Sequence, residues 1–169
     1  MLLRVLRERR IEPGPGQESV WDYPRPLRLE RSAAAIRVVL GGVTVVDTDR
    51  SWRVLETASP PVNYLDPADI APGVLQPCAG ESWCEWKGRA SYFDLTAGGQ
   101  AARRAAWCYP DPTPAFAALA GHVAIYAARV DACFLDGEQV RAQPGDFYGG
   151  WVTSRVTGPF KGDPGTLGW

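Results

Sequence analysis

The sequence predicts an all-β protein with a single main domain. Three observations support this prediction. The chain has 18 glycines and 15 prolines among 169 residues, which is typical of a turn-rich protein. Its apolar residues form short runs of β-branched and aromatic side chains bounded by turn signals. Only one short segment has the start and stop signals of a helix. A chain of this length buries a full core without disulfides or metal.

Residues 1–27 are expected to form an N-terminal extension. A short basic start leads into Pro13-Gly14-Pro15-Gly16, which forbids regular structure. The following segment, WDYPRP, is held extended by its prolines. Trp21 and Tyr23 share one face of this strap, so we expect it to lie over the core surface. The alternatives are a lid over a pocket and an arm that reaches a second subunit.

The β domain is expected over residues 28–143 and begins with a hairpin. AIRVVL and VTVVDT flank Gly41-Gly42, the signal of a two-residue turn, and SWRVLET predicts the next strand. Asp66 followed by Pro67 predicts one helical turn with Asp66 as N-cap. Residues 71–82, rich in proline, glycine and serine, are expected to form a loop.

A second hairpin is predicted over residues 84–110, with its turn at Gly98-Gly99. Pairing of Ala97 with Gln100 places large side chains opposite small ones on one face. The expected pairs are Gly88 with Tyr109, Ala90 with Trp107, and Tyr92 with Ala105. Lys87 then lies on the opposite face of the hairpin from Trp107.

One short helix and two more strands complete the predicted domain. Thr113–Ala120 has Thr113 as N-cap and proline at the first helical position. HVAIYA and ARVDACFLDG have the composition of strands. Residues 144–169 are expected to form a C-terminal extension, whose aromatic residues indicate an ordered wrap rather than a free tail.

Charge and hydropathy exclude several classes of function. The formal net charge of -1 provides no field to attract nucleic acid or an anionic membrane. No apolar run approaches the ~20 residues of a membrane span, and the apolar start is too short for a signal peptide. We therefore expect a soluble, cytoplasmic protein that binds neither nucleic acid nor membrane. Its four cysteines are then expected to be thiols.

Several motifs together resemble the DUF427 family over nearly the whole chain. They are VVLGGVTVVDT, LETASPPVNYL, CEWKGRASYFDL, AWCYPDPTPAFAALAGHVAIY and FYGGWVTSRVTGPFKG. The resemblance implies a domain of unknown function, sometimes labelled nucleotidyltransferase-like. It also implies a β-tent, Mss4-like fold, in which small antiparallel sheets pack face to face around a cleft.

The sequence departs from what two of these likenesses would require. Zinc-bearing relatives of the fold use paired CxxC knuckles, but Cys78, Cys84, Cys108 and Cys133 have no such spacing. The nucleotidyltransferase label needs clustered carboxylates for metal ions, and no Asp-x-Asp pair or phosphate-binding loop is present. We therefore predict no metal site, and the sequence identifies no cofactor.

Two residues are candidates for catalysis, Lys87 and Cys84. Lys87 has small and aromatic neighbours, and burial there would depress its pKa and make it a nucleophile, a base or an anion anchor. The alternative is that its amine reaches water. Cys84 could act as a thiolate if it met His122, the chain's single histidine, in space. Free cysteines are more often small buried apolar residues.

Aromatic residues of the central hairpin predict a binding site for a flat ligand. The expected ligand-binding residues are Glu56, Tyr64, Trp86, Lys87, Tyr92, Trp107 and Tyr109. The alternative is a plain aromatic core. If Lys87 and Trp107 do lie on opposite faces, this set must divide between two places.

The function expected from the sequence is binding of a small molecule in a cleft beside the 84–110 hairpin. Such a protein could also be an enzyme of unassigned reaction. The alternative is a non-enzymatic interaction module, for example a homodimer formed through the N-terminal strap and the C-terminal tail.

Overall fold

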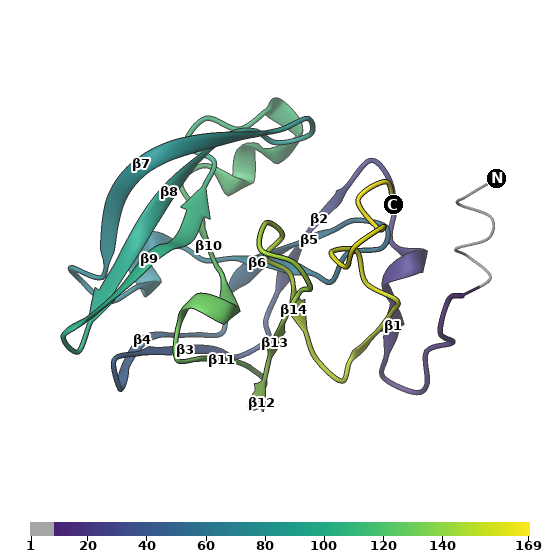
Figure 1. Ribbon diagram of the computed structural model, residues 1–169, viewed down its shortest axis with the longest axis horizontal. Coiled ribbons are helices and arrows are strands. Elements are labelled where there is room, and N and C mark those ends of the chain that lie inside the picture. The colour runs from purple at the N-terminus through teal and green to yellow at the C-terminus, as the bar shows by residue number, and fades with distance from the viewer. Residues whose placement is uncertain (1–8) are drawn as a thin grey trace.

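The computed structural model describes residues 9–169, which form fifteen short strands joined by turns and loops (Figure 1). The helical segments in this range are 3₁₀ turns: η1 (Val20–Asp22), η2 (Pro67–Asp69), η3 (Pro114–Leu119) and η4 (Ala127–Arg129). The prediction of a mostly β protein is therefore confirmed. Across the described part of the chain, no helix has the length and apolar character to cross a membrane.

Two four-stranded antiparallel sheets enclose the largest core. One has the order β10-β9-β8-β7 and the other β12-β11-β3-β4. Their strands are β3 (Ile36–Leu40), β4 (Val43–Thr48), β7 (Leu75–Cys84), β8 (Gly88–Ala97), β9 (Gln100–Cys108), β10 (Val123–Ile125), β11 (Ala132–Leu135) and β12 (Glu138–Gln139). Val38 and Leu95, one from each sheet, are fully buried between them.

A third sheet and two strand pairs extend from this core toward the chain ends. The three-stranded sheet has the order β2-β5-β6, formed by β2 (Arg28–Ser32), β5 (Ser51–Leu55) and β6 (Val62–Tyr64). The pairs are β1 (Glu18–Ser19) with β15 (Val156–Thr157), and β13 (Arg141–Ala142) with β14 (Trp151–Val152). Val54 and Tyr64 of this third sheet belong to a second, aromatic core cluster.

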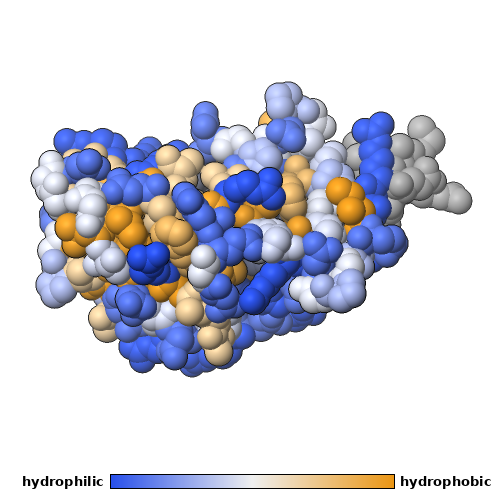
Figure 2. Space-filling model, turned by 90° about the horizontal axis from the view of Figure 1, so that it is seen from below, coloured by the Kyte–Doolittle hydropathy of each residue, from blue (hydrophilic) through white to orange (hydrophobic). Residues whose placement is uncertain are grey.

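Seen from below, polar side chains cover most of the surface (Figure 2). Apolar side chains show between them chiefly toward the end of the molecule that holds the two four-stranded sheets, away from the N-terminus. This distribution agrees with the position of the main core between those sheets.

The first predicted hairpin is confirmed, and its turn contacts that of the second. Leu40 pairs with Val43 across Gly41-Gly42, where both glycines have positive φ. A side chain on Gly41 would place its Cβ 2.3 Å from the Ala97 carbonyl oxygen. The two turns therefore meet backbone to backbone, which a Cβ would prevent.

The second hairpin has the predicted turn but not the predicted register beyond it. Ala97 pairs with Gln100, but Tyr92 pairs with Trp107 rather than with Ala105. A bulge adds two residues to β9 between the partners of Phe93 and Leu95. Because side chains alternate with a period of two, a shift of two residues keeps Tyr92 and Trp107 on the face predicted for them. Inside the bulge the alternation breaks, since Ala105 joins the main core beside Ala106 and Arg104 lies over the Tyr92 ring.

The carboxylate of Asp94 holds this bulge. Its Oδ1 accepts a hydrogen bond of 2.7 Å from the Arg104 amide, and its Oδ2 accepts one of 2.8 Å from Arg103. Arg104 has a φ of 49°, the left-handed conformation that a bulge requires here. These contacts lower the pKa of Asp94, the Arg104 amide most of all.

The expected loop over residues 71–82 is wrong, because most of it is the edge strand β7. Its pairing with β8 is interrupted by a bulge between Cys78 and Glu81. Pro77 lies in this strand, which an edge position tolerates since the missing amide faces no partner. Most residues of this edge strand are exposed or half-buried, so the sequence lacks the alternation of apolar and polar residues that would have predicted a strand.

The two predicted helical segments are single or kinked 3₁₀ turns. η2 begins as predicted, with the Asp66 carboxylate accepting a hydrogen bond of 2.9 Å from the Ala68 amide. η3 is kinked at Phe116, and Thr113 does not cap it with its side chain. The Thr113 hydroxyl instead donates to the Trp86 carbonyl at 2.6 Å.

The N-terminal strap and the C-terminal tail pack against each other. Trp21 is buried, and its indole donates a hydrogen bond of 2.8 Å to the Pro159 carbonyl. Its ring meets Trp169 edge to face, with centroids 5.3 Å apart. Figure 1 shows both segments at the same end of the molecule. The parallel pairing of β1 with β15 continues this contact.

Candidate functional site

A cavity of about 250 Å³ lies beside the aromatic face of β8 and β9. Strands β5 and β6 and the loop that follows β13 form its other walls. All eight residues predicted from the sequence line it: Glu56, Tyr64, Cys84, Trp86, Lys87, Tyr92, Trp107 and Tyr109. The structure thus brings the catalytic and ligand-binding candidates together at one place.

Lys87 lies in the turn between β7 and β8, so its expected place on the opposite face of the hairpin is wrong. The chain reverses at Gly88, which has a φ of 101°, and the Thr113 amide donates to the Lys87 carbonyl at 3.1 Å. The side chain therefore reaches the same face as Trp107 and Tyr109. Its ammonium lies 5.3 Å from the centroid of the Tyr109 ring. The predicted ligand-binding residues therefore lie around one cavity and are not divided between two faces of the hairpin.

The Lys87 side chain is buried but has no polar partner of ordinary geometry. The residue is 8% exposed, and within residues 9–169 its amine makes no ion pair and donates no hydrogen bond. Burial lowers the pKa of Lys87, but the neighbouring acidic groups, Tyr64 first and then Cys84, outweigh burial and raise it. The depressed pKa expected from burial alone is therefore wrong, and Lys87 is a cation at neutral pH.

Two tyrosine hydroxyls lie near this charge. Tyr64 is 1% exposed and Tyr109 is buried, and burial raises the pKa of both phenols, so each keeps its proton. The Tyr64 hydroxyl lies near the Trp107 indole and the Tyr109 hydroxyl, and the Tyr109 hydroxyl lies near the Cys84 thiol, but none of these contacts among the described residues has the geometry of an ordinary hydrogen bond. Both are thus available as donors beside the Lys87 ammonium.

Aromatic rings pack at angles around the cavity. Tyr64 meets Trp107 edge to face, at 6.3 Å and 85°. Tyr126 also packs against the Trp107 ring, with centroids 4.5 Å apart. The Tyr92 hydroxyl is already bonded to Ser82 Oγ, at 2.8 Å. Tyr92 therefore contributes mainly a wall.

Glu56 is the half-buried carboxylate of the cavity, and its charge is compensated from outside. Its Oε1 lies 3.4 Å from Arg25 Nε, in the N-terminal strap. Arg25 does not line the cavity. The strap thus neutralises a negative charge that would otherwise face Lys87.

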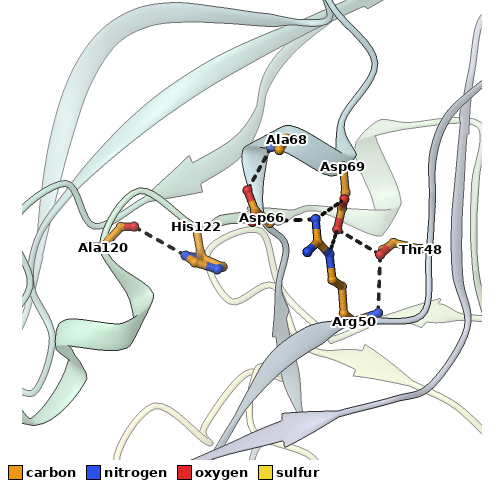
Figure 3. A network of polar contacts seen from close by, with 7 residues as sticks. All are labelled: Thr48, Arg50, Asp66, Ala68, Asp69, Ala120 and His122. Carbon is orange, nitrogen blue, oxygen red and sulfur yellow. Dashed lines mark hydrogen bonds and ion pairs between the residues drawn. The ribbon is translucent and has the colours of Figure 1, made fainter.

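The structure does not bring Cys84 and His122 together. Cys84 lines the cavity, whereas His122 does not. The His122 ring lies by the polar network at η2, with Nδ1 3.3 Å from the Ala120 carbonyl (Figure 3). In that network Asp69 binds Arg50 through two hydrogen bonds, which lower the pKa of Asp69. The hypothesis of a Cys84–His122 nucleophile pair is wrong.

The tail contributes a side of the cavity that the sequence analysis did not assign. Its lining residues are Phe147, Tyr148, Gly149 and Lys161, and Gln143, just before the tail, lines the same side. Gly149 lies directly on the Trp107 ring, where an added Cβ would be 2.2 Å from Cη2. The sequence does contain one signal of this contact, the pair Gly149-Gly150 outside any predicted hairpin. Glycine allows the backbone to approach another part of the protein closely.

A larger hollow of about 530 Å³ lies on the other side of the β2-β5-β6 sheet. Most of its charges are paired with one another, Arg53 with Glu18 at 2.9 Å and Arg155 with Asp136 at 2.6 Å, and its exposed Arg31 lies over the Trp52 ring at 4.2 Å. A pocket whose charges are already compensated offers less to a ligand than one with a free ammonium. The smaller cavity is the better candidate site.

The described residues include no group of three or more histidine, cysteine or acidic side chains placed to hold a metal ion. The four cysteines are free. Burial raises the pKa of Cys108 and raises that of Cys133 to about 12, so both remain thiols at neutral pH.

Comparison with known proteins gives one match. A search of curated proteins finds none. The sequence model of one family, described as a domain of unknown function (DUF427), matches residues 28–136. That range contains Lys87, Trp107 and Tyr109 and covers more than half of the chain, but it contains neither the strap nor the tail. The chain belongs to the DUF427 family.

Proposed function

We propose that this protein binds a small molecule in the cavity formed by the β8–β9 hairpin, strands β5 and β6, and the tail. The observation that carries the proposal is the Lys87 ammonium, which is buried in the cavity wall without a carboxylate partner in residues 9–169. Ligand sites are typically apolar clefts with a few convergent polar groups, and this cavity has that composition.

The free energy of burial explains why such a group indicates a ligand. Removing an ammonium from water costs several kcal/mol unless a partner compensates it. The ring of Tyr109 supplies part of this compensation, about 0.5–2 kcal/mol for a cation over an aromatic face. A buried ammonium with no carboxylate partner among residues 9–169 departs from the usual rule that buried charges are paired. Exceptions to local stability rules of this kind are typical of functional positions.

The protonation states favour binding, or electrostatic stabilisation, over nucleophilic catalysis. Lys87 keeps its proton because its pKa is raised, and Tyr64 and Tyr109 keep theirs because burial raises their pKa values. In an enzyme of unassigned reaction, these groups would stabilise negative charge that develops on the substrate. Cys84 would pack beside Lys87 and would not act as a nucleophile, since no histidine lines the cavity.

We further propose that residues 28–143 form the β-tent-like domain and that residues 1–27 and 144–169 are extensions which close its cleft. We propose a cytoplasmic location for it. The homodimer alternative has less support, because Trp21, Tyr23 and Trp169 pack within one chain. A changed mass in solution after deletion of residues 1–27 would support the dimer.

A thermal-shift screen with nucleotides and metabolites tests the proposed function. Wild type, Lys87→Met and Arg141→Met are compared. Arg141→Met is the matched control, because it also removes one positive charge but at an exposed residue outside the cavity. A ligand at 100 times its Kd adds about 2.7 kcal/mol of stability. We expect a ligand that stabilises wild type and Arg141→Met but not Lys87→Met. Equal stabilisation of all three would place the ligand elsewhere and contradict the proposal.

A further inference from the structure

We infer that the ligand of this cavity is a planar organic anion, an aromatic carboxylate with a single ring. The inference rests on the proposed function and names its ligand class. The carboxylate would lie against Lys87, and the ring would lie among the aromatic walls. The sign of the charge, the arrangement of donors, and the size and shape of the cavity each support it.

The cavity wall holds a cation that is not paired with a carboxylate among the described residues. Lys87 has no carboxylate partner in residues 9–169, and Glu56 is already paired with Arg25. Lys161, on the tail side, lies over the Tyr148 ring at 4.9 Å and donates a hydrogen bond of 3.2 Å to the main-chain oxygen of Trp169, so Lys87 is the lining cation that lacks such an oxygen partner among the described residues. The remaining acidic lining residue, Glu85, is exposed. An anion is the charge complement of this arrangement.

The polar groups near Lys87 are hydrogen-bond donors. The ammonium carries three protons, and the phenols of Tyr64 and Tyr109 each carry one because burial raises their pKa values. A carboxylate accepts about four hydrogen bonds through its two oxygens, and bonds to a charged donor are the stronger kind. A ligand with a carboxylate therefore satisfies all three groups at once.

Size and shape limit the body of the ligand. The volume of about 250 Å³ is smaller than the ~300–1,000 Å³ of sites for drug-sized ligands, so it suits one ring. The walls are aromatic, and aromatic rings prefer offset or edge-to-face neighbours, as Tyr64 and Trp107 already show. A nucleoside triphosphate is too large for this space. Substituents on the ring would meet Trp83 and Phe147, which also line the cavity and are 77% and 60% exposed.

Four small probes separate the elements of this inference when they are added to the ¹⁵N-labelled full chain. Benzoate is the planar anion, benzamide is its neutral isostere, cyclohexanecarboxylate is the non-planar anion, and inorganic phosphate is an anion without a ring. The readout is the shift of the indole N–H signals of Trp86 and Trp107, assigned by substitution with phenylalanine. We expect benzoate to bind at least tenfold more tightly than each of the other three probes.

Variants test the role of the charge. Lys87→Met should lose the preference for benzoate over benzamide, whereas Arg141→Met should keep it. If Lys87→Met does not fold, the comparison of the four probes on wild type still decides the inference. Equal binding of benzamide and benzoate at the cavity would overturn the ligand class and leave the proposed function intact. Phosphate or cyclohexanecarboxylate binding as tightly as benzoate would also overturn it. No response of the cavity indoles to any probe would overturn both proposals.

Discussion

Substitution of Gly149 by alanine tests whether the tail and the β8–β9 hairpin form one closed structure around the cavity. Gly149 lies against Trp107, and a Cβ would lie 2.2 Å from Cη2 and 2.7 Å from Cζ3 of that ring. Both atoms belong to a rigid indole, which also packs against Tyr126, with ring centroids 4.5 Å apart. The indole and the tail must therefore move apart to admit the added methyl group.

The size of the effect follows from this crowding. An added methyl group in a well-packed core costs about 1–3 kcal/mol of unfolding free energy. Each kcal/mol lowers the Tm of a domain of this size by about 2–4 °C. We therefore expect Gly149→Ala to lower the Tm by about 2–12 °C. The cavity should also change, because Gly149 and Trp107 both line it.

Thermal and urea unfolding measure the stability change, with Gly168→Ala as the matched control. Gly168 lies in the same tail, its φ is not in the left-handed region, and no atom lies within 4 Å of the position of its Cβ. The control should change the Tm by less than 1–2 °C, as expected for a surface substitution of about 0.5 kcal/mol or less. If Gly149→Ala were as stable as Gly168→Ala, the tail would not pack on Trp107, and the cavity wall described above would be wrong.

Three further predictions concern the buried charge and the strap. Lys87→Met should lower the unfolding free energy at neutral pH by about 0.5–2 kcal/mol, since the raised pKa means that the fold favours the charged lysine and the contact with the Tyr109 ring is lost; a higher urea midpoint would contradict this. The hydrogen bonds from Arg53, more than that from Tyr23, lower the pKa of Glu18 in the folded protein. Glu18 therefore stabilises the fold at pH values above its unfolded pKa of about 4.3, and this contribution is lost as the pH falls through the lower pKa of the folded state. Glu18→Gln should flatten this part of the curve of urea midpoint against pH, and an unchanged curve would count against the contact. Trp21→Ala should cost about 3–5 kcal/mol, measured by urea unfolding, because the buried ring and its bond to Pro159 are both lost; a loss below 1 kcal/mol would mean that the strap is not held.

Local signals predicted the hairpin turns and the N-cap of η2. A two-residue hairpin turn requires positive φ at two adjacent residues, and the pairs Gly41-Gly42 and Gly98-Gly99 allow it. This requirement can be read from the sequence alone. Asp66 before a proline works in the same way, because its bond to Ala68 spans two residues. Such features depend on neighbours in the chain and need no knowledge of the tertiary fold.

The register of the central hairpin depended on contacts that the local pattern does not contain. The bulge is held by the hydrogen bond from the Arg104 amide to the Asp94 carboxylate, and the alternation of side chains along β9 does not predict it. The face of Tyr92 was nevertheless predicted correctly, since a shift of two residues preserves it. Lys87 was misplaced for a different reason. It was counted as a strand residue, whereas it lies in the turn before Gly88.

The residues contributed by the tail could not be predicted from the sequence pattern. Gly149 and Lys161 reach the cavity through long-range packing, and they lie about 40 residues or more beyond Trp107 in the chain. Hydrophobic alternation gives no information about which distant segment covers a given sheet face. The aromatic content of the tail indicated order, but it did not indicate the partner.

The cavity combines a family domain with segments outside the matched range. Residues 28–136 supply Lys87, Trp107 and Tyr109, whereas Gly149 and Lys161 lie beyond the range that the family model matches. A lysine on an uncovered sheet face would keep its water, and its charge would bind a small anion only weakly. Coverage by the tail places Gly149 on the Trp107 ring, and Lys87, in the turn before β8, is only 8% exposed. In the function that we propose, this enclosure strengthens the attraction between the Lys87 charge and an anionic ligand.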